Sequence, residues 1–265
     1  MNSIEARMLE LLKDLSNNHG VIAIKAEFEA EGSRTEELVK LNEIVFRADM
    51  DLYIKIGGCE AVRDMDECRV LGASGIMAPM IETPFAMSKF IGALNHVYNE
   101  EEKKNLKFII NAETKTCLEN FDAILSVKGI EILHSVIVGR VDLSASMSLS
   151  RNEIEGEKVL DATKTFLEKA RAKGIMAGIG GGISLNSVPT FDKLNGILEK
   201  FETRKVVFKI PEALSDIDNA IVKAMEFEML YLKNKCLNYS RMAQEDITRI
   251  KMMEDRIAAM KAKIK

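Results

Sequence analysis

Short hydrophobic runs rich in Val and Ile alternate with longer, charged stretches along the first 210 residues of the chain. Runs that are apolar at consecutive positions are typical of strands buried on both faces of a parallel sheet. The pattern predicts seven such strands, the fifth of which is long enough to form two: residues 20–28, 52–57, 75–81, 106–113, 130–139, 174–180 and 205–210.

The stretches between these runs have the period of amphipathic helices. An opening helix is expected at about residues 2–16, where apolar side chains recur at helical spacing and Gly20 follows the helix. Seven or eight strand–helix units within residues 1–210 favour a closed (β/α)8 TIM barrel of the α/β class. A doubly wound open sheet is the alternative, but no G-x-G-x-x-G motif follows the first strand.

Residues 211–265 have a different pattern, with no glycine and no further proline after Pro211. Residues that are apolar except for Asp246 recur alternately three and four positions apart: Met225, Met229, Leu232, Cys236, Tyr239, Ala243, Asp246, Ile250, Met253, Ile257, Met260 and Ile264. This a/d seam predicts that the last barrel helix continues into a long, coiled-coil-like helical arm. The arm could pack along its own barrel, but a seam of roughly five heptads favours oligomerisation because it needs a partner surface.

Composition and charge argue against several classes of function. The chain has 265 residues, of which 47% are hydrophobic and 29% charged. A net charge of -4 disfavours a general nucleic-acid binder, which needs a clustered basic surface. No apolar run reaches the roughly 18 residues of a membrane span, so no membrane partner is expected. Four scattered Cys, no C-x-x-C pair and no signal-like N-terminus favour a cytoplasmic location with reduced thiols.

Polar residues follow nearly every predicted strand, at the end where parallel α/β folds bind their ligands. Glu113 closes the strand at 106–113 and Asp142 follows the strand at 130–139, so the two acids would be neighbours on one rim. Either acid alone is more simply explained as a helix cap or a solvated loop residue. As a pair they suit Mg²⁺ or Mn²⁺, which prefer oxygen ligands. The sequence therefore predicts a divalent-metal site at this rim.

Three ordered segments resemble one known family. The segments GASGIMAPMIETPFAMSKF (72–90), FIINAETKTCLENFDAILSVKGIE (108–131) and VIVGRVDLSASM (136–147) are similar to those of the HpcH/HpaI aldolase and citrate lyase β-subunit family. Family members typically have a P-M-V-E-T-like segment, an I-E-T-like strand end and a G-x-x-D-L-S segment in this order. Over about residues 20–210 the resemblance lies in the alternation of strands and helices. It extends to specific sequence motifs over about residues 70–147.

The resemblance implies a (β/α)8 barrel in which Glu113 and Asp142 bind the divalent metal. In the family this metal holds the oxygens of a 2-oxo acid such as pyruvate and stabilises the enolate formed in aldol cleavage or condensation. A basic residue at the end of an earlier strand, usually Arg, lies beside the oxygen that develops charge. Lys55 stands at that position in this chain. The Lys ammonium is a point charge and cannot make the paired, bidentate hydrogen bonds of an Arg guanidinium.

Family aldolases also have a Glu-His pair after an early strand, whose His is the base, and acyl-CoA lyases have Glu-Asp there. The chain has KAEFEA, in which Glu27 matches the Glu and Phe28 stands at the second position. Phe cannot move a proton. The candidates for proton transfer are then Glu27, Glu29, Lys25, Glu60 or a metal-bound water, of which Glu27 ranks first and would also orient the substrate. The three His residues are expected to be structural.

Further residues near the rim are predicted to bind the substrate: Lys25, Arg34, Gly57, Gly58, Glu60, Gly180 and Gly181. The cations and the Gly-rich segments would suit a carboxylate or a phosphate, because Gly lets backbone amides approach an anion closely. For GIGGGISLNS (178–187), a strand that needs small side chains is an equally good explanation. Cys59 is more simply a small residue than a nucleophile, because it has no His partner in view.

These features predict a carbon–carbon lyase of the aldolase or citrate-lyase type that acts on a small, possibly phosphorylated carboxylate and forms homo-oligomers. Lys55 would stabilise the developing negative charge and Glu27 would orient the substrate or move a proton. One alternative is acyl-CoA or phosphoenolpyruvate chemistry on the same metal–enolate barrel. Another is a non-catalytic binding or scaffold protein, which the missing base and the long C-terminal helix would suit.

Overall fold

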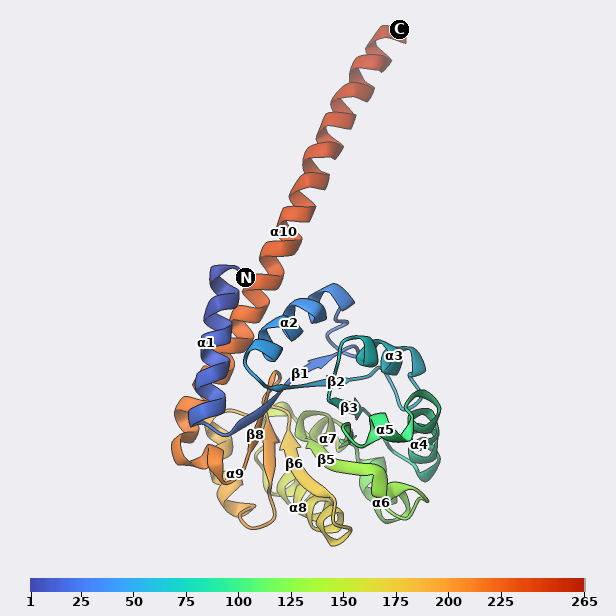
Figure 1. Ribbon diagram of the computed structural model, residues 1–265, viewed down its shortest axis with the longest axis vertical. Helices are drawn as coiled ribbons and strands as arrows, with labels where there is room; N and C mark the ends of the chain where they lie inside the picture. The colour runs from blue at the N-terminus through green and yellow to red at the C-terminus, as the bar shows by residue number, and fades with distance from the viewer. Residues whose placement is uncertain (265) are drawn as a thin grey trace.

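The fold is a closed eight-stranded barrel with helices outside it and one long C-terminal helix (Figure 1). The computed structural model describes the backbone of residues 1–264 and every side chain within it except those of residues 241, 242 and 258–264. The predicted fold class, an α/β barrel with a C-terminal helical extension, is therefore confirmed.

The barrel strands follow one another around the sheet in chain order. Their bounds are β1 Val21–Glu27, β2 Asp51–Lys55, β3 Gly75–Ala78, β4 Lys107–Ala112, β5 Leu133–Gly139, β6 Met176–Gly180, β7 Lys200–Glu202 and β8 Val206–Lys209. All seven predicted strands are present. The run at 130–139 forms one strand, because a 3-10 turn at Ile130–Ile132 occupies its beginning.

Helices connect most of the strands and cover the outside of the barrel (Figure 1). They are α1 Ser3–Asn18, α2 Thr35–Arg47, α3 Val62–Val70, α4 Pro84–Val97, α5 Glu100–Lys103, α6 Lys115–Ile124, α7 Arg140–Ser146, α8 Glu157–Ala172, α9 Val188–Lys193 and α10 Ile217–Ile264. The expected opening helix corresponds to α1, which begins with a capping box formed by Asn2 and Glu5.

The last strand departs from the all-parallel barrel that the sequence pattern predicts. Strands β1 to β7 pair in parallel, but β8 is antiparallel to both β7 and β1. Only residues 203–205 separate β7 from β8, and a parallel crossover needs about a dozen residues or more. The sequence pattern missed β7 because it is three residues long. As a result, Lys205 lies at the same rim as the carboxyl ends of β1 to β7.

Long side chains from one strand fill the barrel interior beside glycines of the next. A Cβ on Gly178 would lie 2.6 Å from the Lys200 side chain, and a Cβ on Gly180 would lie 2.9 Å from the Glu202 side chain. Below this charged layer, a separate apolar cluster fills the middle of the barrel: Ala23, Tyr53, Met77, Ile109, Ile137 and Val207. The interior is thus packed with side chains rather than open.

The long helix α10 has two parts. Its first part packs beside α1 and buries side chains such as Ala224 and Phe227 against the barrel. Further on, the helix extends away from the barrel, and its described side chains over residues 243–257 are exposed (Figure 1). Of the predicted seam, Met260 and Ile264 have side chains outside the described residues. The domain division at residue 210 and a role of 211–265 in oligomerisation stay predictions.

Among the described residues, no helix is both long enough and apolar enough to cross a membrane. The four Cys residues are free thiols, of which Cys68 and Cys117 are buried and Cys236 is exposed.

Lys200 is a fully buried cation inside the barrel. Its ammonium donates a hydrogen bond to the Ser135 hydroxyl at 2.6 Å. Burial lowers the pKa of Lys200 from 10.5 to about 8, although the Glu202 carboxylate opposes the shift. The folded protein therefore releases this proton near pH 8, whereas the unfolded chain keeps it until about pH 10.5. Burying the charged Lys200 lowers the free energy of unfolding, and this destabilisation has its full size below pH 8. It decreases between pH 8 and pH 10.5, where the folded protein has lost the proton and the unfolded chain still holds it.

We expect Lys200→Met to raise the free energy of unfolding at pH 7 by about 1–4 kcal/mol, as in other replacements of buried ionic groups by apolar ones. This advantage should shrink between pH 8 and pH 10.5, because the wild-type Lys200 loses its charge there. Urea unfolding across this pH range measures the difference. Lys173→Met, at an exposed position, is the control and should not show this pH dependence. A constant difference between Lys200→Met and wild type at all pH values would contradict the assignment.

Candidate active site

The carboxyl ends of β1, β2 and β4 bring three of the predicted site residues to one rim. Glu27 is the last residue of β1 and Lys55 the last residue of β2, and the two are partners in the register of this strand pair. Glu113 directly follows β4. All three side chains are buried, so this part of the rim is not an exposed edge.

Glu113 is held in one orientation by its neighbours. Its Oε1 accepts a hydrogen bond from the Met80 backbone N–H at 3.0 Å, and its Oε2 accepts one from the Asn111 amide at 3.0 Å. The next residue, Thr114, caps α6 by accepting a hydrogen bond from the Cys117 N–H at 3.1 Å. Because this cap starts the helix immediately after the strand, the Glu113 side chain stays at the rim.

Met80 has a positive φ of 51°, a backbone conformation that is uncommon for a residue with a long side chain. Its N–H is the group that binds Glu113. Backbone strain of this kind is concentrated at functional sites, where the surrounding structure maintains it. The strained loop after β3 therefore belongs to the same site as the carboxylate after β4.

Asp142 lies in the first turn of α7, directly after β5, and is exposed. Burial is the main reason that the pKa of Glu113 is raised, and the negative charge of Asp142 contributes to it. Arg140, at the start of the same helix, does not point to this site. It is 1% exposed and binds Glu155 at 2.8 Å, and it also donates to the Gly181 carbonyl at 3.2 Å.

Lys55 is surrounded by acids. Its Nζ lies 2.7 Å from Glu29 Oε2 and 3.8 Å from Glu113 Oε1. Burial alone would lower the pKa of Lys55, but the carboxylates of Glu113, Glu29 and Glu27 raise it above the ordinary value. Burial raises the pKa of Glu113. This increase is offset only in part by Lys55, the Met80 N–H and Asn111, which stabilise the ionised carboxylate. Lys55 therefore remains a cation beside a carboxylate that binds a proton more readily than usual.

Glu27 differs from its neighbours at the rim because no described side chain pairs with its carboxylate. It is 8% exposed, and within the described part of the chain no hydrogen bond or ion pair engages its side-chain oxygens. Its charge nevertheless acts on both Lys55 and Lys205. A buried carboxylate between two cations is available to a ligand or a proton.

Two further ion pairs complete the rim. Lys25, from the middle of β1, lies 2.5 Å from Glu202 of β7, and the buried Lys205 pairs with Glu31. Sequence reasoning identified Lys25 but missed the other three residues. For Glu202 the signal was present in KFETRK (200–205), where Lys200 and Glu202 are two positions apart, the spacing of residues on one face of a strand.

The remaining predicted substrate-binding residues are not all gathered at this rim. Arg34 is exposed and stacks over the Tyr239 ring of α10 at 5.0 Å. The exposed Glu60 forms an ion pair with Lys89 at 2.5 Å. The Gly57 N–H donates to Asp64 at 2.7 Å, so this amide already has a partner, whereas no atom would contact a Cβ added at Gly58. Their roles in substrate binding stay predictions.

The glycines after β6 have packing roles. Gly180 provides the space for the Glu202 side chain. Gly181 has a φ of 78°, which L-residues rarely adopt, and a Cβ there would lie 2.8 Å from the Val141 N. Both positions therefore require glycine for structural reasons, while anion binding by their amides stays a prediction.

The groups at this rim fit a divalent cation. Glu113 supplies a buried carboxylate, Asp142 an exposed one, and the Asn111 side-chain oxygen is buried without a hydrogen-bond partner. Carboxylate and amide oxygens are the donors that Mg²⁺ and Mn²⁺ prefer. Among the described residues no group of three or more His, Cys, Asp or Glu forms a ligand cluster, so water or substrate would complete the coordination.

Comparison with known proteins gives the relationship. Residues 34–180, more than half of the chain, match the sequence model described as HpcH/HpaI aldolase/citrate lyase. The chain belongs to this family. The matched region contains Lys55, Glu113 and Asp142, and the resemblance seen in the sequence is thereby confirmed.

Characterised relatives are distant. The chain is 27% identical over 129 residues to a 4-hydroxy-2-oxovalerate aldolase of Rhodococcus jostii RHA1, a match that covers 41% of this chain and 48% of the relative. It is 26% identical over 132 residues to a 2-keto-3-deoxy-L-rhamnonate aldolase of Salmonella schwarzengrund CVM19633, covering 41% and 47%. The chain thus spans about half the length of these relatives. Membership of the HpcH/HpaI family suggests a carbon–carbon lyase.

A solved structure supports the fold. The HpcH/HpaI aldolase/citrate lyase family protein of Burkholderia cenocepacia J2315 superimposes with a TM-score of 0.59. The alignment covers 91% of this chain and all of that one, at 13% sequence identity. At this identity the likeness concerns the fold alone.

Gly139 is expected to be essential for the position of Glu113. A Cβ at residue 139 would lie 2.5 Å from Glu113 Oε2 and 2.8 Å from Glu113 Cβ. Gly139→Ala should therefore displace the carboxylate and lower the free energy of unfolding by about 1–3 kcal/mol, the usual cost of overpacking. The control is Gly58→Ala, where an added Cβ contacts nothing within 4 Å. Equal unfolding midpoints for the two variants in urea would contradict this interpretation.

Proposed function

We propose that this HpcH/HpaI family member is a divalent-metal-dependent carbon–carbon lyase that acts on a 2-oxo acid resembling pyruvate, or on a related small carboxylate. The observation that carries the proposal is the buried Glu113 carboxylate. It follows a barrel strand and is fixed by the Met80 N–H and the Asn111 amide, and the negative charge of Asp142 contributes to the raised pKa of this carboxyl. The names of the distant relatives, both aldolases of 2-oxo acids, support the same substrate class.

In this proposal Glu113 and Asp142 hold Mg²⁺ or Mn²⁺, with the Asn111 oxygen available beside them. The bound cation would supply Lewis-acid stabilisation of negative charge on the substrate oxygens. Glu29 and Glu113 keep Lys55 protonated, so that its ammonium is already oriented toward the same region. Such a fixed charge stabilises an oxyanion without having to reorganise during the reaction.

Glu27 is the residue that we assign to proton transfer. It is the last residue of β1, pairs with Lys55 in the sheet register, and has no direct partner among the described side chains. Phe28 occupies the place of the family's His or Asp, and it packs against the hydrophobic core. The proton from the carbon next to the substrate carbonyl would therefore pass to the Glu27 carboxylate.

The charges of the rim favour an unphosphorylated substrate over phosphoenolpyruvate or an acyl-CoA. Lys25, Lys55 and Lys205 each have a carboxylate partner, and Arg34 stacks on α10. A phosphate brings about two negative charges and would need cations that are free to bind it. The acyl-CoA and phosphoenolpyruvate alternatives therefore rank second, and the scaffold alternative ranks third.

Metal binding is the first test. Isothermal titration calorimetry with Mg²⁺ or Mn²⁺ should show one site per chain in the wild type. Glu113→Gln and Asp142→Asn should each weaken binding by at least about tenfold, the scale seen when metal-site groups are altered. Glu131→Gln, at an exposed acid outside this rim, should bind as the wild type does. Unchanged affinity in Asp142→Asn would exclude the proposed ligand pair.

Proton exchange tests the chemistry separately from any complete reaction. The metal-loaded enzyme in D₂O should replace the methyl protons of pyruvate by deuterium, which ¹H NMR follows directly. Glu27→Gln should slow this exchange by about 10²–10⁴-fold, the usual contribution of a general base. Its affinity for the metal should be unchanged. If the wild type binds the metal but exchanges no pyruvate protons, the result contradicts the aldolase proposal and favours the scaffold alternative.

A further inference from the structure

Helix α10 presents two different faces along its length. The heptad pattern places Val222, Met229, Cys236, Ala243, Ile250 and Ile257 at position a, and Met225, Leu232, Tyr239, Asp246 and Met253 at position d. Buried side chains of the helix, among them Ala224, Phe227, Tyr231 and Asn234, occupy positions c and f on the opposite side, and Asn234 hydrogen-bonds Asn2 and Glu5 at the start of α1. The helix therefore uses one side for its own barrel. The a/d side is exposed except at Tyr239, which contacts Arg34 and Glu37 next to and within α2.

The a/d side is mostly apolar, with Asp246 as its one charged member. Its large hydrophobic side chains are between 43% and 58% exposed: Val222, Met225, Met229, Leu232, Ile250, Met253 and Ile257. From residue 222 to residue 257 this stripe is about 53 Å long at 1.5 Å per residue. It runs without a break in the helix from the barrel-bound part of α10 into the part that extends away from the barrel (Figure 1).

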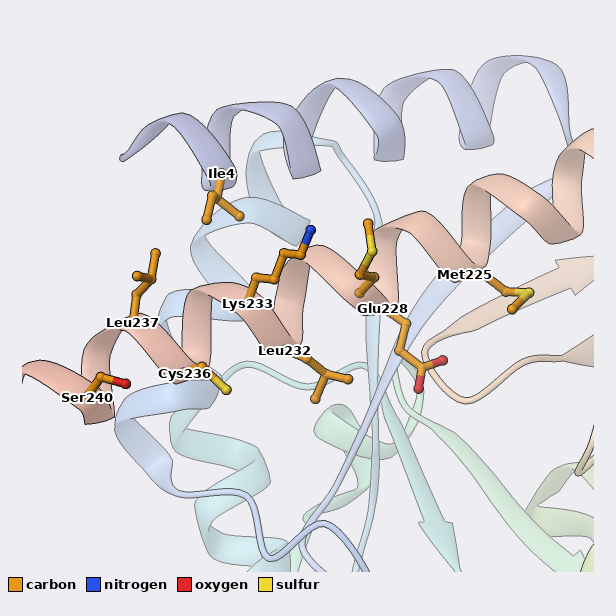
Figure 2. Close-up of a pocket in the computed structure, with 9 residues that line it drawn as sticks. Ile4, Met225, Glu228, Leu232, Lys233, Cys236, Leu237 and Ser240 are labelled. Carbon is orange, nitrogen blue, oxygen red and sulfur yellow. The ribbon is translucent and has the colours of Figure 1, made fainter. Parts of the chain in front are cut away.

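Near the barrel the stripe forms the floor of a groove of about 690 Å³. Figure 2 shows α1 running beside α10, with Ile4 directed toward α10 next to Lys233 and Leu237. Leu232 and Cys236 also line the groove. The groove is lined mainly by apolar side chains, with Glu228, Lys233 and Ser240 among them. A groove of this kind suits an amphipathic helix.

We propose that this stripe is covered by α10 of a second copy of the chain, in a parallel, in-register, two-stranded coiled coil. A seam with heptad spacing is complementary to itself, which a two-fold symmetric interface requires. The buried side chains of α10 lie mainly on its c/f side, opposite the seam. The two barrels would then lie at the same end of the assembly, on opposite sides of the helix pair.

The choice of residues favours two parallel strands. Three of the a positions, Val222, Ile250 and Ile257, have β-branched side chains, whereas no d position does. This distribution is the one that favours parallel dimers over trimers and tetramers.

The flanking charges agree with the same register. Between residues 222 and 257, both members of the g–e′ pair are charged in two cases, Glu228 with Lys233 and Arg249 with Glu254. Both pairs are of opposite sign, and the two-fold symmetry repeats each of them. An antiparallel pairing over the same length would instead bring Glu226 close to Glu254 of the other copy.

One layer opposes association. Asp246 occupies a d position, so a parallel dimer brings two carboxylates together in the seam. This makes a specific prediction, because an antiparallel dimer would not place the two Asp246 side chains opposite each other. Asp246→Leu should lower the dissociation constant of a parallel dimer by at least tenfold.

The test begins with the mass of the full-length protein in solution. Light scattering after size exclusion should give twice the chain mass of 29.6 kDa at micromolar concentration. Ile250→Glu combined with Ile257→Glu should convert the protein to a monomer. The matched control is Thr248→Glu with Met252→Glu, which adds the same charge at positions f and c of the same exposed segment and should leave the dimer intact. Far-UV circular dichroism verifies that each variant is folded.

Charge reversal and cross-linking then test the orientation. Arg249→Glu should weaken the dimer, and adding Glu254→Arg to it should restore the affinity. Cys236 occupies an a position and is exposed, so diamide should link the two Cys236 thiols of a parallel dimer as a disulfide. Cys236→Ser abolishes that product. In the Cys236→Ser protein, Ile250→Cys should cross-link and Lys251→Cys, at position b, should not.

A monomer at all concentrations would overturn the proposal, as would a dimer that survives the two Glu substitutions at 250 and 257. A dimer that cross-links neither through Cys236 nor, in the Ile250→Cys variant, through the introduced thiol would overturn the parallel register. None of these measurements depends on metal binding or on enzyme activity. Failure of the proposed lyase function would therefore leave this inference untouched, and the reverse is also true.

Discussion

Closure of the eight-stranded sheet is the constraint on which the rest of this structure depends. Only three residues connect β7 to β8, so the last strand must return antiparallel to its neighbours to close the barrel. The reversal puts Lys205 at the rim formed by the carboxyl ends of the other strands. It also directs the chain toward the opposite end of the barrel, from which α10 starts. Both the charge pattern of the site and the course of the long helix follow from this closure.

Because the barrel interior contains long charged side chains, charge compensation is the second requirement. Lys25 with Glu202, Lys205 with Glu31, and Lys55 with Glu29 form a set of pairs across adjacent segments. A buried charge without a partner is strongly unfavourable, so these pairs restrict where each side chain can lie. Glu27 and Glu113 exceed the number of cations available, and the excess negative charge is what makes this rim suitable for a cation.

The sequence was sufficient to predict the strand ends but not the network between them. Glu27, Lys55, Glu113 and Asp142 could be placed because each stands at or just after an apolar run, and parallel strands end at one rim. The partners of Lys55 and Lys25 could not be placed, because Glu29 belongs to a loop and Glu202 to a strand of three residues. The reversal of β8 was equally hidden, since its local sequence resembles that of a parallel strand. Strand direction follows from loop length and closure rather than from hydrophobic pattern.

The close packing of glycines against long side chains has a consequence for how this barrel can change. In three places a glycine on one strand leaves room for a large side chain on the neighbouring strand. The pairs are Gly75 with Tyr53, Gly178 with Lys200, and Gly180 with Glu202. Neither member of such a pair can be exchanged alone: enlarging the glycine creates a clash, and shortening its neighbour leaves a void. A change in the side chains that line the barrel interior would therefore require paired substitutions on adjacent strands. The first substitution of each pair, made alone, would be poorly tolerated.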